Sequence, residues 1–156
     1  MSTSDCDLVA GLSPHDAEGV LALGTPTSLP AGAVLFALGS AADSLYLIRR
    51  GRINLTLPLR VGGREEDLLI EERLPGQTVG WSALIPPHRF TLTATAPLPT
   101  EVTVIRRAEL VEYLSGRPDV GYRVAMNVAE VVGQRLQVLQ AMWLREMQRV
   151  VNHARA

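Results

Sequence analysis

Turns that contain glycine interrupt residues 31–76 at short intervals, and this spacing constrains the fold more than any other feature of the chain. They lie at 31–32, 39–40, 50–51, 62–63 and 75–76. Glycine suits such turns because it readily adopts the positive φ angles that tight reversals need. The segments between them are too short for alternating strand–helix units. The spacing therefore predicts a β-barrel or a double-sheet jelly roll.

Short apolar segments rich in β-branched residues fill the intervals between these turns. The expected strands are 34–36, 45–48, 53–59, 68–72, 91–96 and 101–105. Alternation in residues 53–57 predicts that Ile53, Leu55 and Leu57 face the core. Asn54 and Thr56 would then face outward. The proline that follows predicts a sheet edge or a bulge.

Helices are expected before and after the strands. Ser13 has the hydroxyl of an N-cap, Pro14 suits the first helical position, and Gly24 suits the end of a helix, which predicts a helix over 13–24. A β-roll follows over 25–107, and helices occupy 108–151. We interpret residues 1–156 as a single domain of the α+β class, mainly β.

The last expected helix, from about residue 119 to 151, has two apolar stripes. One stripe consists of Ala125, Ala129, Val132, Leu136, Leu139, Trp143 and then Met147 or Val150. The other consists of Val124, Val128, Val131, Val138 and Met142. Two stripes imply two contact surfaces, and a roll of this size covers only part of them. The pattern predicts a homodimer formed through this helix.

The segment 79–96, VGWSALIPPHRFTLTATA, combines a glycine turn, a short apolar turn, two prolines and an arginine that opens a strand. An anion can be held without a metal by converging backbone N–H groups and one guanidinium. Ser82, Ala83 and Leu84 could supply the N–H groups, and Arg89 the guanidinium. The alternative is that Arg89 is a solvated surface side chain, which is the commoner role of a single arginine in such a loop.

Several residues of this segment resemble the phosphate-binding cassette of cyclic-nucleotide-binding domains. They are Gly80, Ala83, Leu84, Pro87 and Arg89. The stretches AGAVLFALGSAADSLYLIRRGRINL and LPGQTVG also resemble the roll that precedes the cassette, so the similarity spans about 29–118. The resemblance implies a β-roll with an N-terminal helix and a long C-terminal helix. In that family the long helix covers the ligand pocket and pairs with its twin in a dimer.

The chain departs from the family at two cassette positions. Trp81 stands where the family has the glutamate that holds the ribose 2′-hydroxyl, and an indole can only donate a hydrogen bond. Phe90 replaces a small residue, although its backbone N–H is expected to remain available. The resemblance therefore implies a small anionic or nucleotide ligand in a degenerate pocket, rather than ordinary cyclic AMP.

The residue that covers this pocket from the long helix can be placed in two ways. Matching the local sequence to the family indicates Leu139 and Gln140, whereas counting from the start of the helix indicates Arg135, about one helical turn away. Both placements stay open at this point. The candidate ligand-binding residues are Gly80, Trp81, Ser82, Ala83, Arg89, Phe90, Thr91 and Arg135.

The composition gives no signature of a nucleic-acid or membrane partner. The formal net charge is −1, and the arginines are spread along the chain. No apolar run approaches the length of a membrane span, and the start, MSTSDCD, lacks the features of a signal peptide. We therefore expect a cytoplasmic protein. Only 152–156 follow the long helix, so we expect no helix-turn-helix and no direct DNA binding.

Side chains that could carry chemistry are few. Cys6 is the only cysteine, in a stretch expected to be frayed, so no internal disulfide or Cys-rich metal site is expected. The three histidines lie in different elements, and His88 alone is a poor basis for haem binding. We interpret the acidic runs 65–67 and 71–72 as solvated hairpin faces. Ser82 lacks the second glycine of a nucleophile elbow. We expect neither a catalytic site nor a metal site.

Two hypotheses about function follow. In the first, the sensor hypothesis, the domain is a non-catalytic regulatory or sensory module. A cyclic nucleotide or another small anion docks on Arg89 and the amides of Ser82 and Ala83 and alters how the long helix packs. In the second, Trp81 fills the space of the ribose, and the domain is a ligand-free structural or protein-interaction module. An open cavity beneath Arg89 would favour the first hypothesis. Trp81 or Phe90 packed into that cavity would favour the second.

Overall fold

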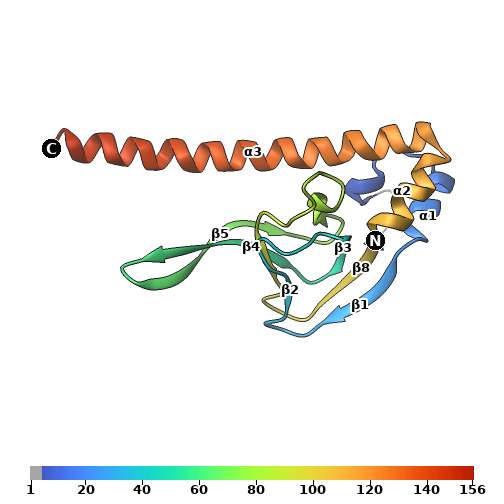
Figure 1. The fold of residues 1–156 in the computed structure, drawn as a ribbon, viewed down its shortest axis with the longest axis horizontal. Helices are drawn as coiled ribbons and strands as arrows, with labels where there is room; N and C mark the ends of the chain where they lie inside the picture. Colours follow the sequence, from blue (N-terminus) through green and yellow to red (C-terminus); the bar gives the residue numbers. More distant parts are fainter. Residues whose placement is uncertain (1–4) are drawn as a thin grey trace.

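The computed structural model describes residues 5–156. The N-terminal stretch from which we expect no signal peptide, residues 1–7, lies partly outside this range. Two four-stranded antiparallel sheets form a roll, and a long helix crosses it (Figure 1). The strands are β1 (Thr25–Leu29), β2 (Val34–Phe36), β3 (Ser44–Arg50), β4 (Ile53–Val61), β5 (Arg64–Arg73), β6 (Thr78–Val79), β7 (Thr93–Thr95) and β8 (Thr100–Arg106). The predicted β-roll with helices at both ends is confirmed.

Most strands that are neighbours in a sheet are not consecutive in the chain. One sheet has the order β1-β8-β3-β6, and the other has the order β2-β7-β4-β5. Apolar side chains of both sheets meet between them and form the core. The residues with no exposed surface include Leu45, Leu47, Ile48, Ile53, Val102 and Ile105. Burial of such side chains is the main favourable term in folding.

β4 departs from the predicted alternation at Thr56. Ile53 and Leu55 are buried and Leu57 packs against the core as predicted, but Thr56 is also buried, so its predicted outward position is wrong. At this point the register between β4 and β5 shifts, because Leu55 pairs with Glu71 and Thr56 pairs with Leu69. The extra residue, Ile70, is a β-bulge on β5 and locally bends that strand. Beyond Thr56, β4 no longer pairs with β7. The remaining β4–β5 hairpin projects as an arm (Figure 1).

The N-terminal segment is more ordered than the sequence indicated. A 3-10 turn, η2 (Asp7–Val9), precedes α1 (Pro14–Leu21), and the Ser13 hydroxyl accepts a hydrogen bond from the Asp16 N–H as the predicted N-cap. Cys6 is only 2% exposed, so the expectation of a frayed segment there is wrong. Burial raises the pKa of the Cys6 thiol, because the apolar surroundings disfavour the thiolate.

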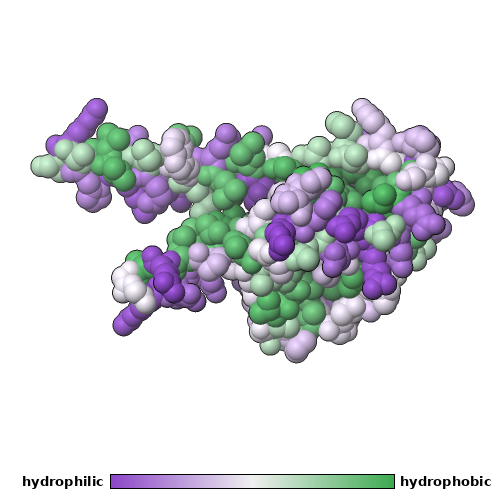
Figure 2. Space-filling view, in the orientation of Figure 1, coloured by the Kyte–Doolittle hydropathy of each residue, from purple (hydrophilic) through white to green (hydrophobic). Residues whose placement is uncertain are grey.

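Two helices follow the roll, α2 (Arg107–Ser115) and α3 (Pro118–Ala154). The first part of α3 packs on the roll through the buried Val120, Val124 and Val128. The later part continues past the roll (Figure 1), and apolar atoms show along its surface (Figure 2). Its exposed apolar residues are Leu136, Leu139, Trp143, Leu144, Met147, Val150 and Val151. Among residues 5–156, no helix has the length and apolar character needed to span a membrane.

Candidate functional site

The cassette-like segment folds around Gly80, which caps the 3-10 turn η3 (Trp81–Ala83). Gly80 has a φ of 87°, and a Cβ atom there would lie 3.0 Å from the carbonyl oxygen of Ser44. Glycine therefore meets two needs at this position, the left-handed backbone and the close approach of β3. The Ala83 N–H donates to the Gly80 carbonyl at 3.0 Å, and the Leu84 N–H donates to the Trp81 carbonyl at 2.9 Å. Two of the three amides predicted to hold an anion are thus used within the turn.

Arg89 lies on the surface of the loop that follows. Its side chain is exposed, and its Nη1 donates to the carbonyl of Gly39 at 2.9 Å. The backbone N–H of Phe90 donates to the carbonyl of Ser40 at 3.0 Å, so the prediction that it is available is wrong. These bonds tie the loop to residues 39–40. The Arg89 guanidinium is engaged by this turn and does not reach the cavity described next.

A small cavity lies behind η3, between the β2-β7-β4-β5 sheet, the cassette-like segment and α3. Its volume is about 10 Å³. It is lined by Phe36, Leu55, Gly80, Trp81, Ser82, Phe90, Thr91, Leu92 and Arg135. The rings of Phe36 and Phe90 are stacked, with their centroids 3.7 Å apart and an angle of 10° between their planes. A volume of this size holds about one water molecule. The cavity is therefore too small to hold a nucleotide.

Most of the candidate ligand-binding residues are brought together at this cavity. Those that line it are Gly80, Trp81, Ser82, Phe90, Thr91 and Arg135. Ala83 is fully buried in the core, and Arg89 faces the surface loop. Of the two placements of the long helix, the structure has Arg135 over the cavity, since Leu139 and Gln140 are exposed. The role of these residues in ligand binding stays a prediction.

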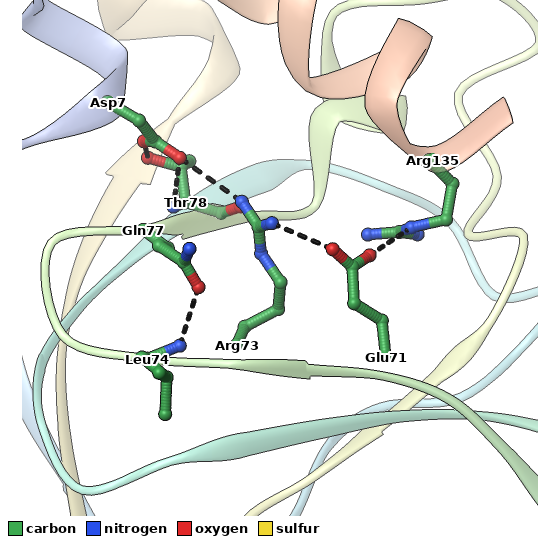
Figure 3. Close-up of polar contacts among 7 residues, drawn as sticks. All are labelled: Asp7, Glu71, Arg73, Leu74, Gln77, Thr78 and Arg135. Carbon is green, nitrogen blue, oxygen red and sulfur yellow. Dashed lines mark hydrogen bonds and ion pairs between the residues drawn. The ribbon is translucent and has the colours of Figure 1, made fainter. Parts of the chain in front are cut away.

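The Arg135 side chain reaches β5, where its Nε donates to the carboxylate of Glu71 (Figure 3). The second oxygen of Glu71 accepts from Nη1 of Arg73 at 3.0 Å. Nη2 of Arg73 donates to Asp7 at 3.1 Å. Asp7 in turn accepts bonds from the Thr78 hydroxyl at 2.6 Å and from the Thr78 N–H at 3.1 Å. This ion-pair network connects the N-terminal segment, β5, β6 and α3.

Sequence reasoning missed Glu71. We interpreted it as part of a solvated hairpin face, but its side chain is only 19% exposed. It pairs across the sheet with Leu55, and Arg73 pairs with Ile53, so both charged residues lie on the inward face. Their two-residue spacing was the available signal, because residues two apart on a strand share a face. The interpretation gave too much weight to the neighbouring acidic residue, Glu72, which is exposed.

The sequence model of the cyclic nucleotide-binding domain matches residues 26–117. The chain belongs to the cyclic nucleotide-binding domain family. This confirms the resemblance inferred from the sequence. A search of curated proteins found no match. Among residues 5–156, no group of three or more His, Cys, Asp or Glu side chains is placed to hold a metal ion.

Solved structures agree with this assignment. A proposed cyclic nucleotide-binding protein of Geobacter metallireducens is 29% identical, with a TM-score of 0.67, over 83% of this chain and 91% of that one. The N-terminal domain of a transcriptional regulator from Streptomyces coelicolor is 25% identical, with a TM-score of 0.69, over 85% and 91% of the two chains. The Thermus thermophilus catabolite activator protein is 25% identical, with a TM-score of 0.73, over 91% of this chain and 63% of its own. The cyclic nucleotide-binding fold is thus shared with regulatory proteins.

Proposed function

We propose that this chain is a non-catalytic regulatory module that works without a bound cyclic nucleotide and forms a homodimer through α3. The small volume of the cavity is the observation that carries the first part of the proposal. Stacked Phe36 and Phe90 fill the space beside Trp81, and the Arg135 guanidinium is paired with Glu71. A regulatory role agrees with two of the similar proteins, the transcriptional regulator from S. coelicolor and the catabolite activator protein of T. thermophilus.

The spacing of apolar residues along α3 supports the dimer. Ala129, Leu136, Trp143 and Val150 recur every seven residues. A seven-residue repeat of apolar side chains is typical of a helix that pairs with another helix. Leu136, Trp143 and Val150 are 56%, 62% and 62% exposed in the single chain. Contiguous apolar surface of this kind marks an interaction site.

An apolar groove beside α3 extends the same surface toward the roll. Its volume is about 570 Å³. Its walls are Trp81, Leu84, Ile85, Leu114, Gly121, Val124, Ala125, Val128, Ala129, Val132 and Gly133. Ala125, Ala129 and Val132 belong both to this groove and to the apolar stripe of the helix. A second copy of α3 that follows the stripe would therefore also enter the groove, and the small side chains there would let the two helices approach closely.

Light scattering of purified protein tests the dimer. We expect the wild type to be a dimer and the double variant Leu136→Asp/Leu139→Asp to be a monomer, because two charges would face the apolar seam. The matched control is Gln134→Asp/Gln137→Asp, which adds the same charge with the same three-residue spacing at exposed positions away from the apolar stripe. This control should remain a dimer. A dimeric, folded Leu136→Asp/Leu139→Asp protein would contradict the proposal.

Calorimetric titration tests the claim that no ligand is needed. We expect no heat of binding when cyclic AMP, cyclic GMP or a cyclic dinucleotide is added to the wild type. Binding that is lost in Arg89→Ala would instead support the sensor hypothesis, in which the anion sits on Arg89. A protein partner other than a second copy, and a cytoplasmic location, stay predictions.

A further inference from the structure

Four charged side chains form one connected network beneath α3 (Figure 3). They are Asp7, Glu71, Arg73 and Arg135, joined by ion pairs of Asp7 with Arg73, of Arg73 with Glu71 and of Glu71 with Arg135. The side chains of Arg73 and Arg135 are 4% and 8% exposed, and that of Glu71 is 19% exposed. Two carboxylates face two guanidinium groups, so the formal charges of the network cancel. Buried charges persist only when they are compensated in this way.

Glu71 is the centre of this network, because each of its oxygens accepts from a different arginine. The position of Glu71 is fixed through Arg73. Arg73 is bound to Asp7 and to the carbonyl of Thr78, and Asp7 is itself held by Thr78. Glu71 therefore cannot swing away from Arg135 without leaving Arg73 partly unpaired in the core.

Among the described residues, Arg135 is the only arginine that lines the cavity. Within residues 5–156, Glu71 is the sole hydrogen-bond partner of that guanidinium, through Nε. An arginine has five N–H donors, so the group retains donors for an anion. Gly80, Ser82 and Thr91 form the wall of the cavity with it. Any anionic group that entered the cavity would be attracted to Arg135 and would meet the carboxylate of Glu71 beside it.

We propose that Glu71 is the specificity-determining residue of this cavity: as an internal anion it holds Arg135 in place, so that the cavity keeps its small volume and anionic ligands are excluded. An anion bound at Arg135 would place a third negative charge in a network that holds two positive ones. Like charges this close in a poorly solvated site repel strongly. The inference rests on the proposed function, since it explains why a pocket of this family would stay closed without a nucleotide.

Glu72 provides an internal comparison. It is the next residue on β5 and points to the opposite face, where its carboxylate lies 3.7 Å from Nη1 of Arg52 and is 46% exposed. Replacing Glu72 with Gln removes the same charge from the same strand without changing the cavity. Glu71→Gln removes the charge beside Arg135 while keeping the size of the side chain and one hydrogen-bond acceptor. The two variants separate the effect of net charge from the effect of position.

The experiment follows the melting temperature of wild type, Glu71→Gln and Glu72→Gln as inorganic phosphate or cyclic AMP is added at constant ionic strength. We expect Glu71→Gln to gain an increase of about 3 °C or more at an anion concentration about tenfold above its Kd. Wild type and Glu72→Gln should remain within about 1 °C of their anion-free values. A response to phosphate alone would indicate a site for the anionic group, and a response only to cyclic AMP would indicate that the base or ribose is also needed. Either response supports the proposal.

Further outcomes decide against it. A folded Glu71→Gln protein that responds to neither anion overturns the role of Glu71. If Glu71→Gln does not fold, the wild type is titrated with phosphate instead, and the NMR signal of the Arg135 Nε–Hε group is followed. This signal should not move with phosphate, and movement would overturn the proposal. Loss of the dimer in wild type would contradict the proposed function but not the expected response of Glu71→Gln. A dimeric, anion-insensitive Glu71→Gln protein would contradict the Glu71 assignment alone.

Discussion

At the scale of single residues, glycine fixes the cassette-like turn more firmly than the arginine does. Gly80 sits where η3 begins, with β3 directly behind it, and its left-handed backbone turns the chain toward Trp81. Arg89, by contrast, makes one backbone contact on an exposed loop. At a glycine with a positive φ angle, a neighbouring atom can lie close to the position that a Cβ atom would take. Such a glycine cannot be replaced without moving that neighbour.

Gly80→Ala should therefore destabilise the protein more than Gly32→Ala. Both positions have positive φ angles, of 87° and 85°, so both variants should lose about 1–2 kcal/mol from backbone strain. A Cβ at Gly32 would meet nothing within 4 Å, whereas at Gly80 it would lie 3.0 Å from a carbonyl oxygen. The contact should add about 1–3 kcal/mol. Urea unfolding measures both free energies, and equal losses would show that the contact is unimportant.

At the scale of elements, α3 is attached to the roll at separate points rather than along its whole length. Asn127 is buried and donates to the carbonyls of Leu8 and Ala10, both at 2.9 Å. About two helical turns further on, Arg135 is paired with Glu71. The contact with the N-terminal segment and the contact with β5 hold the first part of α3 in place. The part beyond them makes no such contact, and its large apolar side chains are exposed.

Asn127→Ala should weaken the attachment at the N-terminal segment. The carbonyl of Leu8 would be left buried without a donor, and we expect a loss of about 2 kcal/mol in the free energy of unfolding. Asn152→Ala is the control, because Asn152 is exposed in the same helix and accepts a hydrogen bond only from Gln148. It should change stability by less than about 0.5 kcal/mol. Similar losses in the two variants, measured by urea unfolding, would argue against the attachment.

At the scale of the whole molecule, the roll and the far end of α3 have different surroundings. The roll buries an apolar core between its sheets, whereas α3 beyond Leu136 keeps a row of large apolar side chains exposed (Figure 2). A single chain offers nothing to cover them. The two tryptophans report on these two surroundings, since Trp81 lies against the roll and Trp143 is 62% exposed.

Fluorescence of the Trp81→Phe variant should therefore report self-association through Trp143 alone. Dilution below the dissociation constant of the dimer should shift its emission to longer wavelength, because the indole moves from an apolar contact into water. The matched Trp143→Phe variant retains only Trp81, which lines the groove but already packs against the core in the single chain, so its shift over the same range should be smaller. An emission maximum in Trp81→Phe that does not depend on concentration would place Trp143 outside the interface.

Local patterns in the sequence predicted much of the fold. The spacing of glycine turns predicted the roll, and the N-cap of Ser13 predicted the start of α1, because turns and caps depend on neighbouring residues. The buried position of Thr56 was missed because burial depends on how segments distant in sequence pack together. The order around Cys6 was missed because it depends on Asn127, which is distant in sequence.

The sequence by itself determined the family, the roll and the long helix with its unpaired apolar side, because these follow from periodicity and from residues close in the chain. Only the tertiary structure decided the state of the site. It turned Arg89 onto Gly39, stacked Phe36 on Phe90 and brought Glu71 to Arg135. These contacts join residues far apart in sequence, and their geometry depends on how β5, the cassette-like segment and α3 pack together.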